Sequence, residues 1–423
     1  MDSNDRLSAR REFLTFLAAS PLLAFAGLTP RLLAAALEPA QEANRGQGID
    51  VRTENPLAVL PPHDEAVIKS VKDALTVMDF ELAARAKMSP AHFYDWTIGT
   101  FFDETLKANR AGFEQYQIRL RRLTGIPPAA VDTSQTLFGV KWDYPLFLCP
   151  IGPLRALDPE GYRNVARAGK TRNTLTMVGS GLLEDVNAVK RGEPIWYQFS
   201  GPWKPERIKE VERAGWPAVV WTVDYTQGSN LEHYRTRQRY YTPEACNGCH
   251  GDAGPSAGPR MAGEASYGPG QTWNDVKRLK DFTTMKVILK GIVTRDDAEL
   301  AVQNGADGII CSTHAAHVDA AGRGSIESLP EVVAGAAGKI PVFVDSGFRG
   351  GADMFKALAL GAKMVGVGRP YAWALVSFGQ EGIEAMIDLL HTELRIIMAQ
   401  AGTPSIAKIT KASLATRDYA WER

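Results

Sequence analysis

Residues that can move protons follow several short apolar runs in the second half of the chain. Asp224 ends "AVVWTVD", Lys290 lies in "VILKG", and His314 comes just after "GIICS". An imidazole takes up a proton near neutral pH when a carboxylate holds its ring and favours the protonated form. A lysine beside it stabilises an anionic cofactor ring or intermediate. We interpret His314 as a base, Asp224 as its orienting carboxylate and Lys290 as the cation, although His314 in isolation could equally be a structural histidine.

Two glycine-rich segments are candidates for binding a phosphate. "DSGFRGG" contains Gly347 and Arg349, and "GVGRP" contains Gly368 and Arg369. Glycines let backbone N–H groups approach an anion, and arginines add bidentate, charge-assisted hydrogen bonds. One such arginine alone is more often a surface ion pair, whereas two after consecutive apolar runs favour a phosphate site. Further candidate cofactor ligands at the ends of apolar runs are Pro150, Gln198, Thr222, Ser312 and Asp345.

The segment "CNGCHGDAG" combines a pair of cysteines with a histidine directly after the second. A c-type haem is attached through this spacing, with Cys246 and Cys249 bonded to the porphyrin and His250 as an axial iron ligand. Met261 and His233 are candidates for the second axial ligand. A Cys246–Cys249 disulfide or a metal site stays open, although a zinc site would want more ligands than His250 adds.

The elements that must position these residues are apolar runs, each followed by a helical stretch. This alternation predicts an α/β fold, namely a (β/α)8 TIM barrel with an N-terminal helical extension. Functional residues of such a barrel lie at the carboxyl ends of its strands, and its last two loops are the usual phosphate site. The cysteine motif lies in the widest gap between runs, over 225–285. The expected strands are 145–150, 174–179, 195–200, 218–224, 287–291, 308–312, 341–347 and 364–369.

The start of the chain has the pattern of an export signal. "SARREFLTFLAASPLLAFAG" places Arg10 and Arg11 before an apolar run that is too short for a comfortable membrane span. This pattern predicts a twin-arginine signal over 1–40 and a periplasmic protein, in a compartment where c-type haem is attached. A chance arginine pair before an amphipathic helix is the alternative. We expect a lead-in linker over 41–63 and the barrel domain over 64–423, with a helical pattern from 64 to 122.

The charge balance excludes one broad class of partner. Lys+Arg and Asp+Glu number 48 each, and no basic run is present. A nucleic-acid binder is expected to carry a basic patch or stripe. We therefore expect a small-molecule substrate and no nucleic acid.

Seven short motifs together resemble the FMN-dependent α-hydroxy-acid dehydrogenase and oxidase family, which includes glycolate oxidase, lactate oxidase and flavocytochrome b2. They are "WYQ", "TVD", "LKGI", "STH", the "DSG" loop, "FKALALGA" and "VGRP", and the similarity covers about residues 85–405. The resemblance implies an FMN-binding TIM barrel and a homo-oligomer, with a tetramer as the family's form. It implies that His314 removes a proton while the α-hydrogen of the substrate passes to the flavin, and that Lys290 lies near flavin N1. It also implies flavin-ring contacts from Gln198, Thr222 and Ser312, and phosphate contacts from the Gly347–Arg349 and Gly368–Arg369 loops.

The chain departs from this family where the family binds its substrate. The arginine that grips the substrate carboxylate is His317 in "STHAAHV", and two substrate-binding tyrosines are Trp96 in "YDWT" and Ser200 in "QFS". An arginine pair that follows "TVD" in the family is missing. A histidine replaces a bidentate arginine clamp only in part. Because the proton-moving and flavin-binding residues are kept, we expect retained redox chemistry on a substrate other than a small free 2-hydroxy acid.

The leading hypothesis is an exported FMN-dependent oxidoreductase that oxidises a hydroxyl-bearing carbon. Its electrons would pass through the haem on the loop to a periplasmic acceptor, and no stable membrane span is expected. One alternative is an ordinary α-hydroxy-acid oxidase in which His317 replaces the arginine. Another is a non-catalytic electron-transfer protein that binds flavin or haem.

Overall fold

The computed structural model describes residues 67–88, 93, 96–152, 154–179, 195–224 and 270–416. All of them belong to one compact unit that begins at Pro56. The predicted export signal, the lead-in linker, and Cys246, Cys249, His250 and Met261 lie outside the described residues. Within the described part of the chain, no helix has the length and apolar character needed to cross a membrane.

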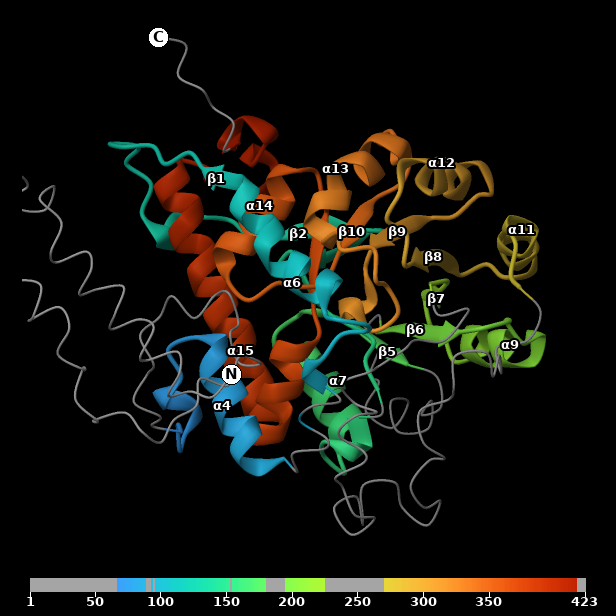
Figure 1. Cartoon of the computed structure of the whole chain (residues 1–423), viewed down its shortest axis with the longest axis horizontal. Coiled ribbons are helices and arrows are strands. Elements are labelled where there is room, and N and C mark those ends of the chain that lie inside the picture. The colour runs from blue at the N-terminus through green and yellow to red at the C-terminus, as the bar shows by residue number, and fades with distance from the viewer. Residues whose placement is uncertain are drawn as a thin grey trace, which may run out of the picture. The chain divides into compact units, whose positions relative to one another are not determined.

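Eight parallel strands form a closed barrel, as the apolar runs predict (Figure 1). Each strand pairs with the next along the chain, and the last pairs with the first, where Val365 lies opposite Leu146. Most strand residues are buried because the barrel interior covers one face and the outer helices cover the other. The strands are β4 (Leu146–Leu148), β5 (Leu175–Gly179), β6 (Ile195–Ser200), β7 (Ala218–Thr222), β8 (Lys286–Lys290), β9 (Gly308–Cys311), β10 (Val342–Val344) and β11 (Met364–Val367).

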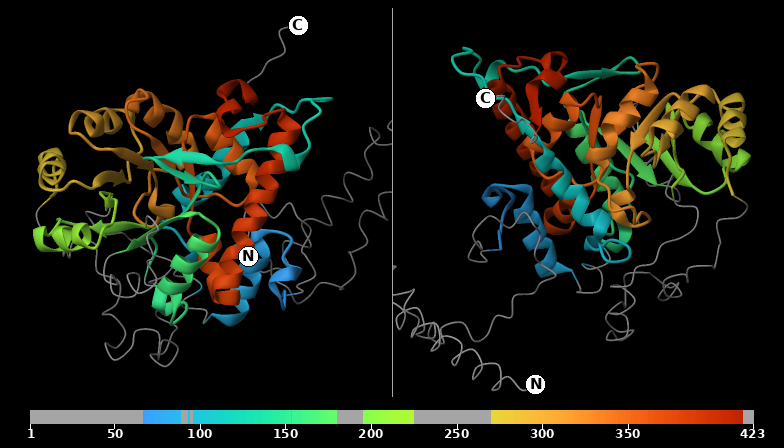
Figure 2. Two further views of the ribbon diagram at one scale, coloured as in Figure 1. Left: turned by 180° about the vertical axis from the view of Figure 1, so that it is seen from behind. Right: turned by 45° about the horizontal axis from the view of Figure 1, so that its top comes forward.

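Helices follow the strands in the βα order of a TIM barrel and lie outside them (Figures 1 and 2). Local sequence signals start several of them. Thr272 and Asp275 form a capping box, the Thr294 hydroxyl accepts from Asp297 N, and Pro205 occupies the first turn of its helix. The helices are α7 (Gly161–Thr171), α9 (Pro205–Arg213), α11 (Trp273–Phe282), α12 (Arg295–Gln303), α13 (Ser325–Ala336), α14 (Gly351–Ala359) and α15 (Arg369–Ala401).

One end of the barrel is closed by aromatic side chains, which leaves polar groups at the other. The ring of Phe138, at the tip of a hairpin made by β2 (Gln135–Leu137) and β3 (Val140–Trp142), lies 5.8 Å from that of Trp196 near the start of β6. Trp196 also packs edge-on against Phe343, at 5.9 Å. Because these apolar rings fill the amino end, a site has to form at the carboxyl ends of the strands.

The N-terminal segment is helical only in part, which corrects the expected helical pattern from 64 to 122. The helices are α4 (Val77–Lys87) and α6 (Glu104–Ala111), and β1 (Tyr116–Ile118) follows. β1 pairs antiparallel with β12 (Leu414–Thr416) near the other end of the chain. The apolar residues keep helical spacing through β1. Its backbone groups are nevertheless satisfied by hydrogen bonds to the distant strand β12 and not by a helix. α4 packs along α15, whose bend at Phe378 and Gly379 interrupts its regular dihedral angles (Figures 1 and 2).

Candidate active site

A histidine–carboxylate pair lies at the carboxyl end of the barrel. His314 Nδ1 is 3.1 Å from Asp224 Oδ1, and the two side chains keep 30% and 14% of their exposure. Burial alone would raise the pKa of Asp224, but His314 and Lys290 outweigh it and hold that pKa below its ordinary value. Asp224 is therefore an anion that accepts from the Nδ1–H group, so Nε2 is the nitrogen of the His314 ring that can take a proton.

Gly291 makes room for this carboxylate. Its φ is +109°, and a Cβ at this position would lie 2.5 Å from Cγ of Asp224. Only glycine adopts such a backbone angle without strain. The residue after Lys290 thus sets the position of Asp224 against His314.

The turn that carries His314 has an unusual backbone. His314, Ala315 and Ala316, which form the short 3-10 helix η7, have φ values of 51°, 54° and 68°. Side chains other than glycine disfavour this left-handed region, so surrounding contacts must hold it. Four hydrogen bonds do so: His314 N to Ser312 Oγ (3.1 Å), Ala315 N to Ser346 Oγ (3.1 Å), Thr100 N to Ala316 O (2.7 Å) and Arg369 Nη2 to Ala315 O (2.9 Å).

Lys290 is buried beside this turn in a small polar network. Its Nζ donates to Ser312 Oγ at 2.9 Å and lies 3.6 Å from Asp345 Oδ2. Burial alone would lower the pKa of Lys290, but Asp345 and Asp224 outweigh it and raise that pKa. The side chain is therefore a fixed cation next to the His314–Asp224 pair.

A second polar group joins the ends of β6 and β7. Gln198 Nε2 donates to Thr222 Oγ1 at 2.8 Å and to Ser200 Oγ at 3.0 Å. Gln198 and Thr222 are buried, whereas Ser200 is exposed. Because both amide hydrogens are in use, the carbonyl oxygen of Gln198 is the part of its amide left to accept from a cofactor.

Two arginines, the half-buried Arg349 and the buried Arg369, follow β10 and β11. Arg349 lies over the ring of Trp373 at 4.9 Å, and burial, then Arg110 and Arg369, lower its pKa to about 9. Nearby, burial raises the pKa of Glu81 on α4, although both arginines act in the opposite direction. Among the described residues, the buried Trp373 Nε1 group has no hydrogen-bond partner. Crowded cations beside an unpaired N–H donor fit a bound anion such as a phosphate.

The structure gives Arg369 a role that the sequence does not predict. Its guanidinium donates to Trp96 O (2.7 Å), Ile98 O (3.2 Å) and Ala315 O (2.9 Å), so it ties the 96–98 segment to the His314 turn. The group is buried, which lowers its pKa to about 10. These bonds use Nε and Nη2, so the predicted phosphate contact of Arg369 stays a prediction, beside Arg349 and the first turn of α15, which begins after Gly368.

The remaining predicted residues lie around the same end of the barrel. Pro150 follows β4 directly after Cys149, whose Sγ lies 3.7 Å from Asp345 Oδ2. Gly347, at a φ of +93°, passes so close to Asn109 that a Cβ would lie 2.1 Å from its carbonyl oxygen. His317 ends the His314 turn, and its Nε2 lies 3.3 Å from Arg369 Nη2. Trp96 contacts this region through its backbone carbonyl, which accepts from Arg369 Nε.

Several supporting residues escape prediction from the sequence. Asn109 on α6 donates through Nδ2 to Thr313 Oγ1 at 2.8 Å, and its Oδ1 accepts from Ser325 N at 3.1 Å. These bonds fix the loop that follows β9. Ser346 lies inside the "DSG" motif, but the sequence does not reveal that its hydroxyl accepts from Ala315 N. Glu81 lies in an ordinary helical pattern. Only the fold shows that Glu81 lies near Arg349 and Arg369.

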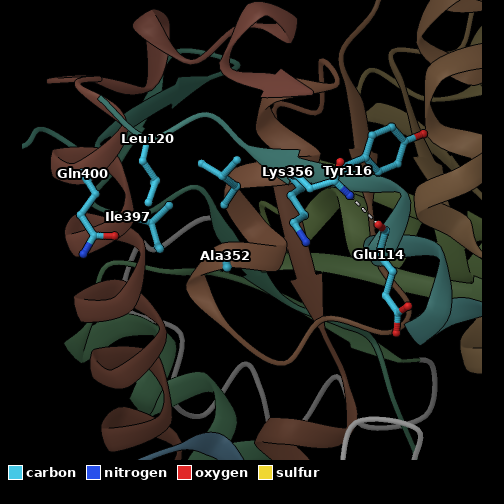
Figure 3. Close-up of a pocket in the computed structure, with 9 residues that line it drawn as sticks. Glu114, Tyr116, Leu120, Ala352, Lys356, Ile397 and Gln400 are labelled. Atoms are coloured by element: carbon cyan, nitrogen blue, oxygen red, sulfur yellow. Dashed lines mark hydrogen bonds between the residues drawn. The ribbon is translucent and has the colours of Figure 1, made fainter. Parts of the chain in front are cut away.

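A hollow in the described surface lies away from these residues. It is formed by β1, α14 and the last part of α15, and Figure 3 shows Glu114, Tyr116, Lys356 and Gln400 around it. Lys356 donates to Phe113 O at 2.9 Å, so its charge is already held by the protein. None of the predicted site residues lines this hollow. Within the described residues there is also no cluster of three His, Cys, Asp or Glu side chains that could hold a metal.

The chain is similar to known proteins over most of its length. Residues 84–416 match the family model described as FMN-dependent dehydrogenase. Glycolate oxidase 1 of Oryza sativa subsp. indica is 33% identical over 356 residues, covering 80% of this chain and 95% of the relative. Spinacia oleracea glycolate oxidase is 32% identical over 354 residues, with 80% and 95% covered.

Solved structures show the same relationship. A crystal structure of mandelate oxidase aligns with a TM-score of 0.71 and 32% identity, covering 81% of this chain and 98% of the other. A lactate oxidase structure from Pediococcus acidilactici aligns with a TM-score of 0.73 and 27% identity, covering 82% and 96%. A mandelate oxidase variant solved with 2-hydroxy-phenylacetamide aligns with a TM-score of 0.69 at 32% identity. The chain therefore belongs to the FMN-dependent dehydrogenase family and is an oxidoreductase acting on CH–OH groups.

Proposed function

We propose that the protein is an exported FMN-dependent oxidoreductase that oxidises a hydroxyl-bearing carbon of a substrate other than a small free 2-hydroxy acid. The observation that carries this proposal is the His314–Asp224 pair at 3.1 Å beside the buried cation of Lys290. At the same end of the barrel, His317 and Ser200 occupy positions where the resemblance places substrate ligands of another kind. The chemistry of proton removal is thus kept while the binding groups are changed.

The residues divide the work of the reaction between them. FMN supplies an acceptor for two electrons when it is bound, and Arg349, the start of α15, Gln198 and Lys290 would hold it. Nε2 of His314 takes the proton of the substrate hydroxyl, and the adjacent carboxylate of Asp224 stabilises the imidazolium that results. Lys290 stays protonated because Asp345 and Asp224 surround it, so it supplies positive charge where negative charge develops.

An anaerobic mixing experiment tests the enzymatic part. The FMN-loaded protein is mixed with hydroxy compounds, and loss of the flavin absorbance is followed in the wild type and in His314→Ala. We expect bleaching that the substitution slows by about 10²- to 10⁴-fold, the usual contribution of a general base. Photoreduction should bleach both proteins equally. A non-catalytic flavin protein would show photoreduction alone, and efficient turnover of glycolate, lactate or mandelate would favour an ordinary α-hydroxy-acid oxidase.

The electron exit is proposed to be a c-type haem on the 225–285 loop. Its support is the spacing of Cys246, Cys249 and His250, the glycine- and proline-rich stretch up to Met261, and the twin-arginine pattern at the start of the chain. A haem there would pass electrons to a periplasmic acceptor. A disulfide or a metal bound by the same cysteines is the competing proposal.

Absorption spectra separate these proposals. After expression with a c-type haem assembly system, a reducible Soret band should survive acid–acetone extraction and vanish in the Cys246→Ser/Cys249→Ser protein. Met261→Leu should shift the spectrum only if this methionine is an axial ligand. For export, Arg10→Lys with Arg11→Lys should keep the protein in the cytoplasm. A wild-type protein with flavin bands alone would contradict the haem.

A further inference from the structure

The fold brings together two cationic segments that lie far apart in the sequence. They are residues 118–131, at and after the end of β1, and residues 394–416, from the end of α15 through β12. Arg119 N donates to Ser413 O at 2.9 Å, and Arg121 N donates to Gln400 O at 2.8 Å. A chain with zero net charge thus carries here six cations and no Asp or Glu, namely Arg119, Arg121, Arg122, Arg395, Lys408 and Lys411. We call the exposed residues of these two segments the cationic surface.

The charges of the cationic surface are not neutralised by neighbouring side chains. Five of the six cations are exposed and Arg395 is half-buried. No carboxylate of the described residues forms an ion pair with any of them. Asp132, which follows the first segment, accepts from Ser134 N at 2.9 Å. The surface is therefore suited to an external partner that carries negative charge.

Apolar side chains project from the same surface. Leu123 is fully exposed, and Leu120 and Ile396 keep 43% and 41% of their exposure. The backbone at Leu123 has a φ of 56°, which is unfavourable for leucine, so the surrounding turn must hold it. The turn packs on the end of α15, where a Cβ at Gly402 would lie 2.9 Å from Thr124 Cγ2. The segment after β1 projects beyond α15 in Figure 1 and carries this leucine outward.

An anionic lipid surface matches both the charge and the exposed leucine. Acidic headgroups attract Lys and Arg, and an apolar side chain is stabilised where it enters the acyl boundary. Single-stranded nucleic acid stacks its bases on aromatic side chains, and neither segment contains one. A second copy of the chain, meeting this surface across a two-fold axis, would place cations against cations.

We propose that the cationic surface binds an anionic phospholipid bilayer, with Leu123 inserted among the lipids and Arg119, Arg121 and Arg122 on the headgroups. This inference goes beyond the proposed function and does not depend on it. None of the predicted site residues lines the hollow that Leu120 borders (Figure 3). Segment 118–131 also leads into the β2–β3 hairpin, whose tip packs at the barrel end opposite the reaction site.

Co-sedimentation of the full-length, FMN-loaded protein with vesicles tests the inference. One set of vesicles contains equal amounts of phosphatidylglycerol and phosphatidylcholine, and the other contains phosphatidylcholine alone. We expect binding to the anionic vesicles that is at least about tenfold tighter and that weakens at high salt, because exposed charges are screened. Every variant keeps the same residues before position 67, so any lipid binding by that part of the chain is common to all.

Two variants of the surface are compared with a matched control. Arg121→Glu with Arg122→Glu should weaken binding to the anionic vesicles at least about 20-fold, at about fivefold for each charge removed. Leu123→Gly should weaken it about tenfold through the loss of the inserted side chain. This substitution also relieves the φ of 56°, so the melting temperature should not fall. Lys204→Glu with Lys277→Glu makes the same change in net charge near α9 and α11, across the barrel from α15, and should alter binding by less than about threefold.

The outcomes distinguish a lipid from other occupants. Equal binding of the wild type to both kinds of vesicle, or equal losses in the control and the arginine variant, overturns the inference. Binding to polyglutamate in place of vesicles would identify a docking surface for an acidic protein and would also overturn it. So would a change of oligomeric state in light scattering of the arginine variant, because the surface would then be an interface between copies. Bleaching of the flavin by a hydroxy compound tests the proposed function separately, and we expect the same bleaching rate in all these variants.

Discussion

Gly291→Ala is expected to slow the reaction by displacing the side chain of Asp224, a residue that the substitution leaves unchanged. The new Cβ would lie 2.5 Å from Asp224 Cγ and 2.6 Å from its Cβ, whereas ordinary contacts lie between 3.4 and 4 Å. Asp224 must therefore retreat by about 1 Å, judged from the contact distances of buried carbon atoms. A retreat of that size lengthens the 3.1 Å contact with His314 beyond hydrogen-bond range.

The magnitude follows from the bond that is lost. A hydrogen bond to a charged group contributes about 1.5–3 kcal/mol, which corresponds to roughly 10- to 150-fold in the rate of flavin reduction. The positive φ adds a separate cost in stability of about 1–3 kcal/mol. Only the loss of the Asp224–His314 hydrogen bond should slow flavin reduction.

Gly305→Ala is the matched control. Gly305 also has a positive φ, of 80°, but a Cβ there would meet only Lys280 Cγ at an ordinary 3.9 Å. Both variants should lose stability in thermal melts, and only Gly291→Ala should slow anaerobic flavin reduction by a hydroxy compound that reduces the wild type. Equal reduction rates in Gly291→Ala and wild type, or an equal loss in the control, would refute the assignment of Asp224 as the group that orients His314.

Three further predictions concern the cofactor, the His314 turn and pH. Arg349→Ala should weaken FMN binding by about 10- to 100-fold in fluorescence titrations, since a charge-assisted contact is lost, and leave riboflavin, which has no phosphate, unaffected; equal weakening of both flavins would place the arginine elsewhere. Ala315→Gly should raise the free energy of unfolding by about 1 kcal/mol, because glycine tolerates the φ of 54° at this position, and denaturant titration measures the change; a loss of stability would show that the turn is not strained. The lowered pKa of Asp224 means that its carboxylate contributes stability above its ordinary value of 3.8, and that this contribution is lost as pH falls through the lower folded value; Asp224→Asn should therefore remove part of the acid dependence below about pH 4, and an unchanged profile would contradict an ionised Asp224.

The sequence predicts the barrel well because the signal for each strand is local. Runs such as 218–224 and 287–291 are apolar up to their last few residues, since those residues are buried on both faces of a parallel sheet. The polar residues at their ends could be found for the same reason, because the carboxyl ends of all strands meet at one end of the barrel. The strand β1 could not be predicted, since its partner β12 lies near the opposite end of the chain.

The supporting contacts of the site depend on tertiary proximity and leave no local pattern. Arg369 has the spacing expected of a phosphate ligand, yet its guanidinium joins Trp96 O to the His314 turn. Asn109 lies in a helix whose sequence gives no sign of the loop that it holds. The left-handed backbone of Ala315 and Ala316 also runs against the preference of alanine for right-handed helix.

The left-handed turn has a consequence for the order of folding. An unfolded chain rarely samples three successive non-glycine residues in this conformation, so the turn cannot act as a nucleus. Its hydrogen bonds come from Thr100, Ser346 and Arg369, which lie on segments far apart in the chain. We expect the barrel to close first and the catalytic turn to lock last, so that substitutions at Ala315 change the unfolding rate and leave the folding rate unaltered. A barrel that has lost only this turn would then be the first species on the way to unfolding, folded in most respects but without its base in position.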